Sequence, residues 1–351
     1  MPSVQPAVAA DFPEVRYPSE QIPQAGELIE VAAGVYWLRM PLPFALDHIN
    51  LWLLQDGAGW TIVDCGFALD ESRANWERIF AERLNGNPVS RIIVTHYHPD
   101  HMGLCAWLGE KFGLVPWISR AEYLQAHAMY HAIGGASNAD VLELFRRHGV
   151  SRDSLSGLAT PDIAYRRGVP VLPNAFFCIR DGSRLVIDGR EWEVITGYGH
   201  APEHSALYCR QLGVLISGDM VLPRISTNVS VWPMEPDGDP LAGFLGSLDR
   251  YDALPADTLV LPSHGLPFQG MHARIAALRS HHAARLDEVR AACAEPRTAA
   301  EMLPVLFRRT LDRHQMFFAM GEAIAHLNYL MHRGQLVRHA DGDGVYRFAC
   351  A

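Results

Sequence analysis

The first part of the chain shows the hydrophobic pattern of a β-sheet. Short apolar runs over 28–31, 35–40, 48–54 and 60–64 are separated by Gly-containing turns, a pattern typical of β-hairpins. An amphipathic helix is predicted over 72–81, and a further strand over 92–95. This part of the chain is therefore expected to form hairpins followed by a β-α-β unit.

The middle of the chain predicts three helices and then a second group of strands. Helical periodicity covers 106–112, 120–133 and 138–148, and a short strand is predicted over 115–118. Residues 151–175 hold several Pro and Gly residues and are predicted to be loop-rich. Strands then follow over 184–187, 191–196, 206–209, 214–217 and 258–261, with a long loop over 220–240 and helices over 241–254 and 271–294.

The pattern changes near Pro296. Two helices over 298–307 and 315–333 precede a β-hairpin over 335–348, which is the order of a winged-helix-like domain. We therefore predict three parts: an extended arm over 1–26, a main domain over 27–295 with a helical insert at about 120–150, and a winged-helix-like domain over 296–351.

Composition restricts the class of partner. The chain has 351 residues, is 49% hydrophobic and 20% charged, and carries a net charge of −9, so neither nucleic acid nor an anionic membrane is an expected partner. The six cysteines show no C-x-x-C spacing, which favours reduced thiols and a cytoplasmic location. Residues 1–10 lack the features of a secretory signal, and no apolar stretch has membrane-spanning length.

The densest group of metal-ligand side chains is the segment from Thr95 to His101. It follows a predicted strand and precedes a predicted helix, where open α/β layers place their active sites. His96 and His98 are two residues apart, so in extended chain they point to the same side. Pro99 ends the extension, and Asp100 and His101 project from the next turn. Such a cluster could hold a pair of divalent ions.

Three further polar residues each follow a later predicted strand and lie beside a Gly. They are His200, Asp219 and His264. Because strand ends of one sheet can converge on one pocket, these side chains are candidates for the same site.

The motifs H-x-H-x-D-H, G-H-x-P-x-H, S-G-D and S-H-G occur in this order between residues 96 and 265. Together they resemble the metallo-β-lactamase-fold hydrolase superfamily, in particular its class II glyoxalase branch. The resemblance covers about residues 28–265 and implies an α+β fold, an αββα four-layer sandwich. The segment after residue 296 resembles, more weakly, the winged-helix tail of a branch that includes a β-lactamase-like endoribonuclease.

This resemblance implies a role for each candidate ligand. His96, His98 and His200 would hold one metal, Asp100, His101 and His264 the other, and Asp219 would bridge both. Imidazole and carboxylate ligands without thiolate suit Zn²⁺, with iron or manganese as alternatives. A hydroxide between the two ions would be the nucleophile, with Asp100 and Asp219 as the catalytic carboxylates.

Other residues are expected to support the ligands or to contact substrate. Asp64, at the end of its strand, and His204, in the second histidine position of its motif, are expected to support the metal ligands. The helical insert and the loop 220–240 are expected to shape an apolar pocket for an acyl group. Candidate pocket residues are His48, Tyr97, Asn228 and Trp232.

The expected function is a dinuclear metal-dependent hydrolase of a small thioester or ester, similar to a hydroxyacylglutathione hydrolase or an acyl-thioesterase. The alternatives are a lactonase or β-lactam hydrolase and an endoribonuclease. A redox member of the flavodiiron type is disfavoured, because such members replace one ligand His by Glu and carry a flavodoxin domain, whereas His98 is present here. A small-molecule substrate is expected, and a homodimer could form through the N-terminal arm or the C-terminal domain.

Overall fold

The computed structural model describes residues 14–84, 86–158 and 164–351. Residues 1–13, half of the predicted N-terminal arm, lie outside the described residues. The described end of the arm runs beside the main body, where the backbones of Arg16 and Gln269 form an antiparallel bridge.

The first sheet has seven strands in the order β1 to β7. The predicted hairpins form its antiparallel half, and the β-α-β unit begins the parallel half, because β4, β5, β6 and β7 pair in parallel. The strands are β1 (Ile29–Ala32), β2 (Val35–Pro41), β3 (His48–Asp56), β4 (Gly59–Val63), β5 (Val89–Ile93), β6 (Trp117–Ile118) and β7 (Phe177–Cys178).

The second sheet has five strands in the order β12-β11-β10-β9-β8. It is antiparallel except for the pair of β11 and β12, which is parallel and connected through α8. The strands are β8 (Arg184–Ile187), β9 (Arg190–Gly197), β10 (His204–Cys209), β11 (Val214–Gly218) and β12 (Leu259–Pro262).

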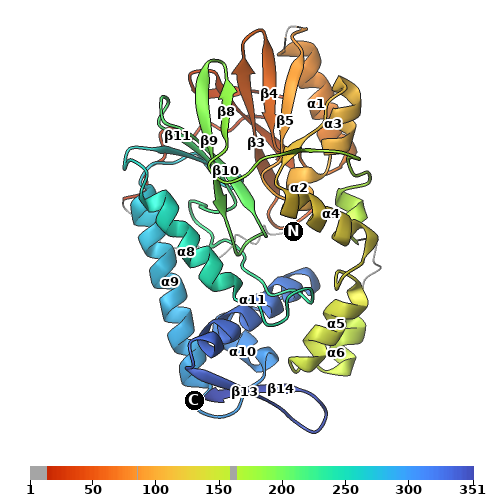
Figure 1. Ribbon diagram of the computed structural model, residues 1–351, viewed down its shortest axis with the longest axis vertical. Coiled ribbons are helices and arrows are strands. Elements are labelled where there is room, and N and C mark those ends of the chain that lie inside the picture. Colours follow the sequence, from red (N-terminus) through yellow and green to blue (C-terminus); the bar gives the residue numbers. More distant parts are fainter. Residues whose placement is uncertain (1–13, 85, 159–163) are drawn as a thin grey trace.

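The two sheets face each other and helices cover their outer faces (Figure 1). The layer between the sheets is apolar and rich in tryptophan, including Trp37, Trp52 and Trp192. Against the first sheet pack α1 (Asp70–Glu82), α2 (Pro99–Met102), α3 (Cys105–Phe112) and α4 (Arg120–His131). Against the second lie α8 (Pro240–Asp252) and α9 (Met271–Ala292). The α+β fold and four-layer αββα sandwich expected from the sequence are confirmed.

The C-terminal elements lie at one end of the sandwich (Figure 1). They are α10 (Ala299–Leu306), α11 (Arg313–His332) and the hairpin of β13 (Leu336–Ala340) and β14 (Tyr346–Cys350). Reciprocal capping boxes begin both helices, at Thr298 with Glu301 and at Asp312 with Gln315. One apolar core runs from α8 and α9 into α10 and α11. The domain boundary near Pro296 stays a prediction.

The segment 151–175 differs from its prediction. It contains two short helices, α6 (Arg152–Leu158) and α7 (Ala164–Gly168), and follows α5 (Asn138–Arg147) of the insert. Gly157 lies inside α6, Gly168 is the last residue of α7, and Pro170 and Pro173 follow α7, so these residues do not prevent two short helices from forming. No helix among the residues that the structure describes is both long enough and apolar enough to cross a membrane.

Candidate metal centre

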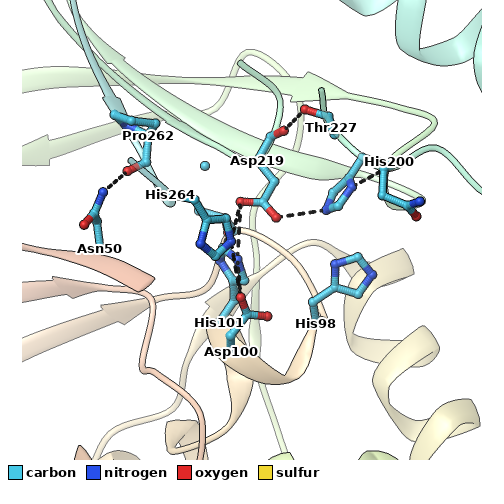
Figure 2. A network of polar contacts seen from close by, with 12 residues as sticks. Asn50, His98, Asp100, His101, His200, Asp219, Thr227, Pro262 and His264 are labelled. Carbon is cyan, nitrogen blue, oxygen red and sulfur yellow. Dashed lines mark hydrogen bonds and ion pairs between the residues drawn. The ribbon is translucent and has the colours of Figure 1, made fainter. Parts of the chain in front are cut away.

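Seven predicted ligands converge at the strand ends between the two sheets. His96 and His98 follow β5, and Asp100 and His101 lie on the short helix α2 that Pro99 begins. Asp219 follows β11 and His264 follows β12, the parallel pair of the second sheet. Figure 2 shows Asp219 between His200 on one side and His264, His101 and Asp100 on the other.

The first cluster consists of His96, His98, His200 and Asp219, whose potential ligand atoms all lie within 4.8 Å of one another. His96 Nε2 lies 2.9 Å from His98 Nδ1 and 3.2 Å from His200 Nε2. Ligand atoms of a tetrahedral zinc ion with Zn–N bonds of about 2.0–2.1 Å lie about 3.3 Å apart. The three imidazoles are therefore spaced like ligands of one ion.

The second cluster consists of Asp100, His101 and His264. His264 Nε2 lies 3.4 Å from Oδ2 of Asp100 and 3.5 Å from Oδ1 of Asp219. The other oxygen of Asp219, Oδ2, lies 3.3 Å from His200 Nε2 in the first cluster. Asp219 thus turns one carboxylate oxygen to each cluster, as a bridging ligand does.

Most of these imidazoles are oriented by a bond at the ring nitrogen that faces away from the cluster. Nδ1–H of His200 donates to the carbonyl oxygen of Asn228 at 2.8 Å, and that of His264 donates to the carbonyl oxygen of His48 at 2.9 Å. A carbonyl oxygen can only accept, so it fixes the proton on Nδ1 and leaves the Nε2 lone pair for a metal.

Asp64 does the same for His101 and lies in the position expected for a supporting carboxylate. Its Oδ2 lies 2.8 Å from His101 Nδ1, and its Oδ1 accepts the backbone N–H of Thr95 at 2.8 Å. Asp64 has a backbone φ of +64°, a left-handed conformation that Asp tolerates better than most residues. This conformation lets one buried carboxylate hold both the ligand ring and the start of the ligand loop.

The electrostatics of the two clusters differ. Burial and the neighbouring His200 lower the pKa of His98 to about 3, so it is a neutral imidazole with a free lone pair. Burial also lowers the pKa of His264, but Asp219 and Asp100 outweigh it and raise that pKa to about 10. Without an ion, protonated His264 therefore offsets the negative charge of the buried carboxylates. A divalent cation would supply that positive charge in place of the proton.

The residues present fit a pair of divalent cations. Both His101 Nε2 and Asp219 Oδ1 are buried and lack a hydrogen-bond partner within the described part of the chain, although they lie 3.6 Å apart. Unpartnered buried polar atoms are costly unless a ligand satisfies them. The donor set of five imidazoles and two carboxylates without thiolate suits Zn²⁺, iron or manganese.

His204, predicted to support the ligands, lies behind Asp219. Its Nε2 accepts the backbone N–H of Asp219 at 3.1 Å, and its side chain is fully buried. Gly218 has a φ of +52°, and a Cβ there would overlap the His204 ring. The glycine of the S-G-D motif therefore permits both the turn and this support.

The four predicted pocket residues take different places. His48 holds the His264 loop, since the Gly265 N–H donates to its Nε2 at 3.1 Å. Tyr97 is only 3% exposed and its ring stacks on Tyr165. Asn228 orients His200 through its backbone, and Trp232 is partly buried against the core beside α8 and α11. Their contact with a substrate stays a prediction.

One residue at the site was missed by sequence reasoning. Glu122 of α4 is fully buried, and its carboxylate accepts the backbone N–H groups of Tyr97, at 2.9 Å, and Glu203, at 2.6 Å. It thereby ties the His96–His98 loop to the loop that carries His200. Burial raises its pKa to about 7 against the effect of both N–H groups. Ser119-x-x-Glu122 matches an ordinary helix-capping pattern, so its spacing gave no sign of this role.

Comparison with known proteins places the chain in a family. The family model described as "Metallo-beta-lactamase superfamily" matches residues 45–264, and one described as "Metallo-beta-lactamase-like, C-terminal domain" matches residues 286–351. The crystal structure of a beta-lactamase domain protein from Burkholderia ambifaria is 50% identical, with a TM-score of 0.91, over 97% of this chain and 99% of that one. The chain therefore belongs to the metallo-beta-lactamase superfamily.

Curated relatives indicate the class of reaction. The chain is 26% identical to the probable metallo-hydrolase YqjP of Bacillus subtilis (strain 168), over 88% of this chain and 96% of the relative. It is 27% identical to a linear primary-alkylsulfatase of Pseudomonas sp. (strain ATCC 19151), over 62% of this chain and 42% of the sulfatase. The protein is thus a metallo-hydrolase of this superfamily, and its site holds a His/Asp cluster suited to divalent metal ions.

Proposed function

We propose that the protein hydrolyses a small thioester or ester with two divalent ions, Zn²⁺ in the first instance, held by the two clusters. The observation that carries this proposal is the position of Asp219, which turns one oxygen to His200 and the other to His101 and His264. A divalent pair bound there would lower the pKa of a water between the ions from about 15.7 towards about 7 and so supply a hydroxide nucleophile.

The residues of the chain supply positioning and charge for this reaction. Asp219 contacts both clusters and so sets their relative position. Asp64 keeps the proton of His101 on Nδ1, the ring nitrogen that faces away from the site. Oδ2 of Asp100 lies 3.4 Å from His264 Nε2 and 3.7 Å from His101 Nε2, so its carboxylate faces the same space as these two ring nitrogens. We assign it, with Asp219, to the catalytic carboxylates.

Exposed apolar side chains beside the ligand segments support an acyl substrate. Tyr198, two residues before His200, is 45% exposed, and Leu46, two residues before His48, is 36% exposed. Phe318 of α11 is 36% exposed, and its carbonyl oxygen lies 3.4 Å from Ser230 Oγ, in the loop between Asp219 and Asp239. Exposed apolar side chains in segments next to the ligand segments favour a substrate with an apolar group.

A substrate screen tests the proposal. The purified protein, loaded with Zn²⁺, would be assayed with acyl thioesters, small esters, lactones, a β-lactam, an alkyl sulfate and RNA. We expect thioester or ester turnover that stops on chelation, returns with Zn²⁺, and is absent in His98→Ala but present in His339→Ala, an exposed histidine on β13. Protein that binds two ions but turns over neither thioesters nor esters would contradict this substrate class.

Sulfate-ester hydrolysis is the second candidate, because the similarity to the alkylsulfatase covers 62% of this chain. Lactonase, β-lactam hydrolase and ribonuclease activity remain the alternatives from the sequence. Turnover of the alkyl sulfate alone would select the sulfatase, and turnover of RNA alone would select the nuclease.

A further inference from the structure

The helix α11 runs along the active-site loop, residues 219–239. The loop begins at Asp219, and at Asn228 its backbone carbonyl oxygen accepts Nδ1–H of His200 at 2.8 Å. The loop ends at Asp239, whose side chain caps α8. Between these points the loop has no regular helix or strand, so its shape depends on what it packs against.

Contacts with α11 hold the second half of this loop at both ends. At the near end the N–H of Val231 donates to the carbonyl oxygen of Gly321 at 3.1 Å. At the far end Asn328 Nδ2, fully buried, donates to the carbonyl oxygens of Pro236 and Gly238 at 3.0 Å each. Further contacts join His332 to the carbonyl oxygen of Asp237 and Arg333 to the carboxylate of Asp239. These contacts with α11 therefore fix the path of the loop from Val231 to Asp239.

Gly321 is the point of closest approach between the helix and the loop. A Cβ added there would lie 2.6 Å from Ser230 Cβ and 3.3 Å from the carbonyl oxygen of Val231. A glycine inside a helix costs about 0.5–1 kcal/mol relative to alanine. The close approach of Ser230 explains why this helix carries one. Ser230 Oγ in turn donates to Asn228 Oδ1 at 2.8 Å.

We infer that Gly321 is a positioning residue for the metal centre. Because Gly321 has no side chain, Ser230 can pack against α11, and this contact fixes the position of Asn228. The carbonyl oxygen of Asn228 then orients His200, so that His200 Nε2 faces the ion of the first cluster. This inference rests on the proposed function only in that it requires an ion at His96, His98 and His200. It assigns a role in metal binding to a helix of the C-terminal region that contributes no ligand.

The test is Zn²⁺ binding by full-length Gly321→Ala, measured by competition with a chromophoric chelator. Changes in residues that orient ligands typically weaken metal affinity about 10–100-fold. We expect one of the two Zn²⁺ ions to bind about 10-fold or more weakly and the other to bind as in the wild type. The matched control is Gly246→Ala in α8, where an added Cβ meets nothing within 4 Å, and we expect no change there.

A second-site variant separates loop displacement from general damage. Ser230→Gly removes the Cβ that the new alanine would meet, so the double variant Ser230→Gly/Gly321→Ala should bind Zn²⁺ as Ser230→Gly alone does. If Gly321→Ala does not fold, Asn328→Ala, which introduces no clash, should weaken the same ion. Wild-type affinity for both ions in Gly321→Ala and Asn328→Ala would overturn the inference and leave the proposed function intact. Absence of Zn²⁺ binding by the wild type would overturn both.

Discussion

His101 Nδ1 lies 2.8 Å from Oδ2 of Asp64, a residue that itself lies outside both ligand clusters. This contact requires the left-handed backbone of Asp64, with a φ of +64°, at the end of β4. A residue outside both clusters thus orients a candidate metal ligand.

Asp64→Asn tests the orientation of His101. Asn tolerates the left-handed backbone, but its amide N–H₂ facing Nδ1 would favour the tautomer with the proton on Nε2, which removes the lone pair for a metal. We expect Zn²⁺ affinity to fall about 10–100-fold, measured by chelator competition. The control is Asp188→Asn, because Asp188 also has a positive φ, of +49°, but pairs with Arg190 outside the clusters. Equal affinities of Asp64→Asn and the wild type would refute this role.

Glu122→Gln tests the tie between the two ligand loops. The carboxylate accepts from two backbone N–H groups, of Tyr97 and Glu203, whereas the amide group of Gln offers one oxygen and turns an N–H₂ to the other donor. A buried donor left without an acceptor costs about 1–3 kcal/mol in the free energy of unfolding. Urea unfolding would measure this loss.

For comparison, Glu82→Gln changes an exposed glutamate paired with Arg78 at 3.4 Å, and its free energy of unfolding should stay within about 0.5 kcal/mol of the wild type. Similar small losses in both variants would show that the Glu122 contacts contribute little.

Gly218→Ala tests the turn that presents Asp219. Gly213 precedes β11 and Gly218 is its last residue, and both have a positive φ, of +63° and +52°. Alanine costs about 1–2 kcal/mol at either position for its backbone alone. At position 213 nothing lies within 4 Å of the new Cβ, but at position 218 it would overlap His204. Thermal unfolding should therefore show a distinctly larger loss for Gly218→Ala, with loss of Zn²⁺. Equal melting temperatures would argue against tight packing of His204 here.

His148→Phe tests a buried histidine between α5 and β14. The ring is fully buried, lies against Tyr346 and Phe348, and neither ring nitrogen has a partner within the described residues. Burial, with Arg338 and Arg147 nearby and against the opposing effect of Asp237, lowers its pKa to about 3. Below about pH 6.5, His148 binds a proton in the unfolded chain but stays neutral in the folded chain. The free energy of unfolding therefore falls as the pH is lowered from 6.5 towards 3.

Phenylalanine removes this penalty. Relative to the wild type, the free energy of unfolding of His148→Phe should rise by about 2 kcal/mol between pH 8 and pH 5, at about 1.4 kcal/mol for each pH unit below 6.5. Urea unfolding at the two pH values measures it. A difference between the two proteins that is the same at both pH values would contradict a neutral, buried His148.

The sequence predicted the elements that carry the site better than the contacts that hold it. The candidate ligands follow apolar strands or lie on the short helix α2 just after one, so local pattern and motif order pointed to seven side chains that the structure brings together. Their role as metal ligands stays a prediction. Glu122, Gly321 and Asn328 were not found, because each acts on a segment far away in the chain while its own surroundings look like an ordinary helix. Tyr97, a candidate for the substrate pocket, is only 3% exposed, which agrees with its place in the extended chain between His96 and His98, whose side chains point to the opposite side.

The metal content of the protein tests the proposed dinuclear centre most directly. The purified protein would be dialysed against Zn²⁺ and then against metal-free buffer. Its zinc content would be measured by inductively coupled plasma mass spectrometry and divided by the protein concentration. We predict two ions per chain, and fewer than two in Asp219→Ala, because that carboxylate faces both clusters. One ion or none in the wild type would contradict a dinuclear centre.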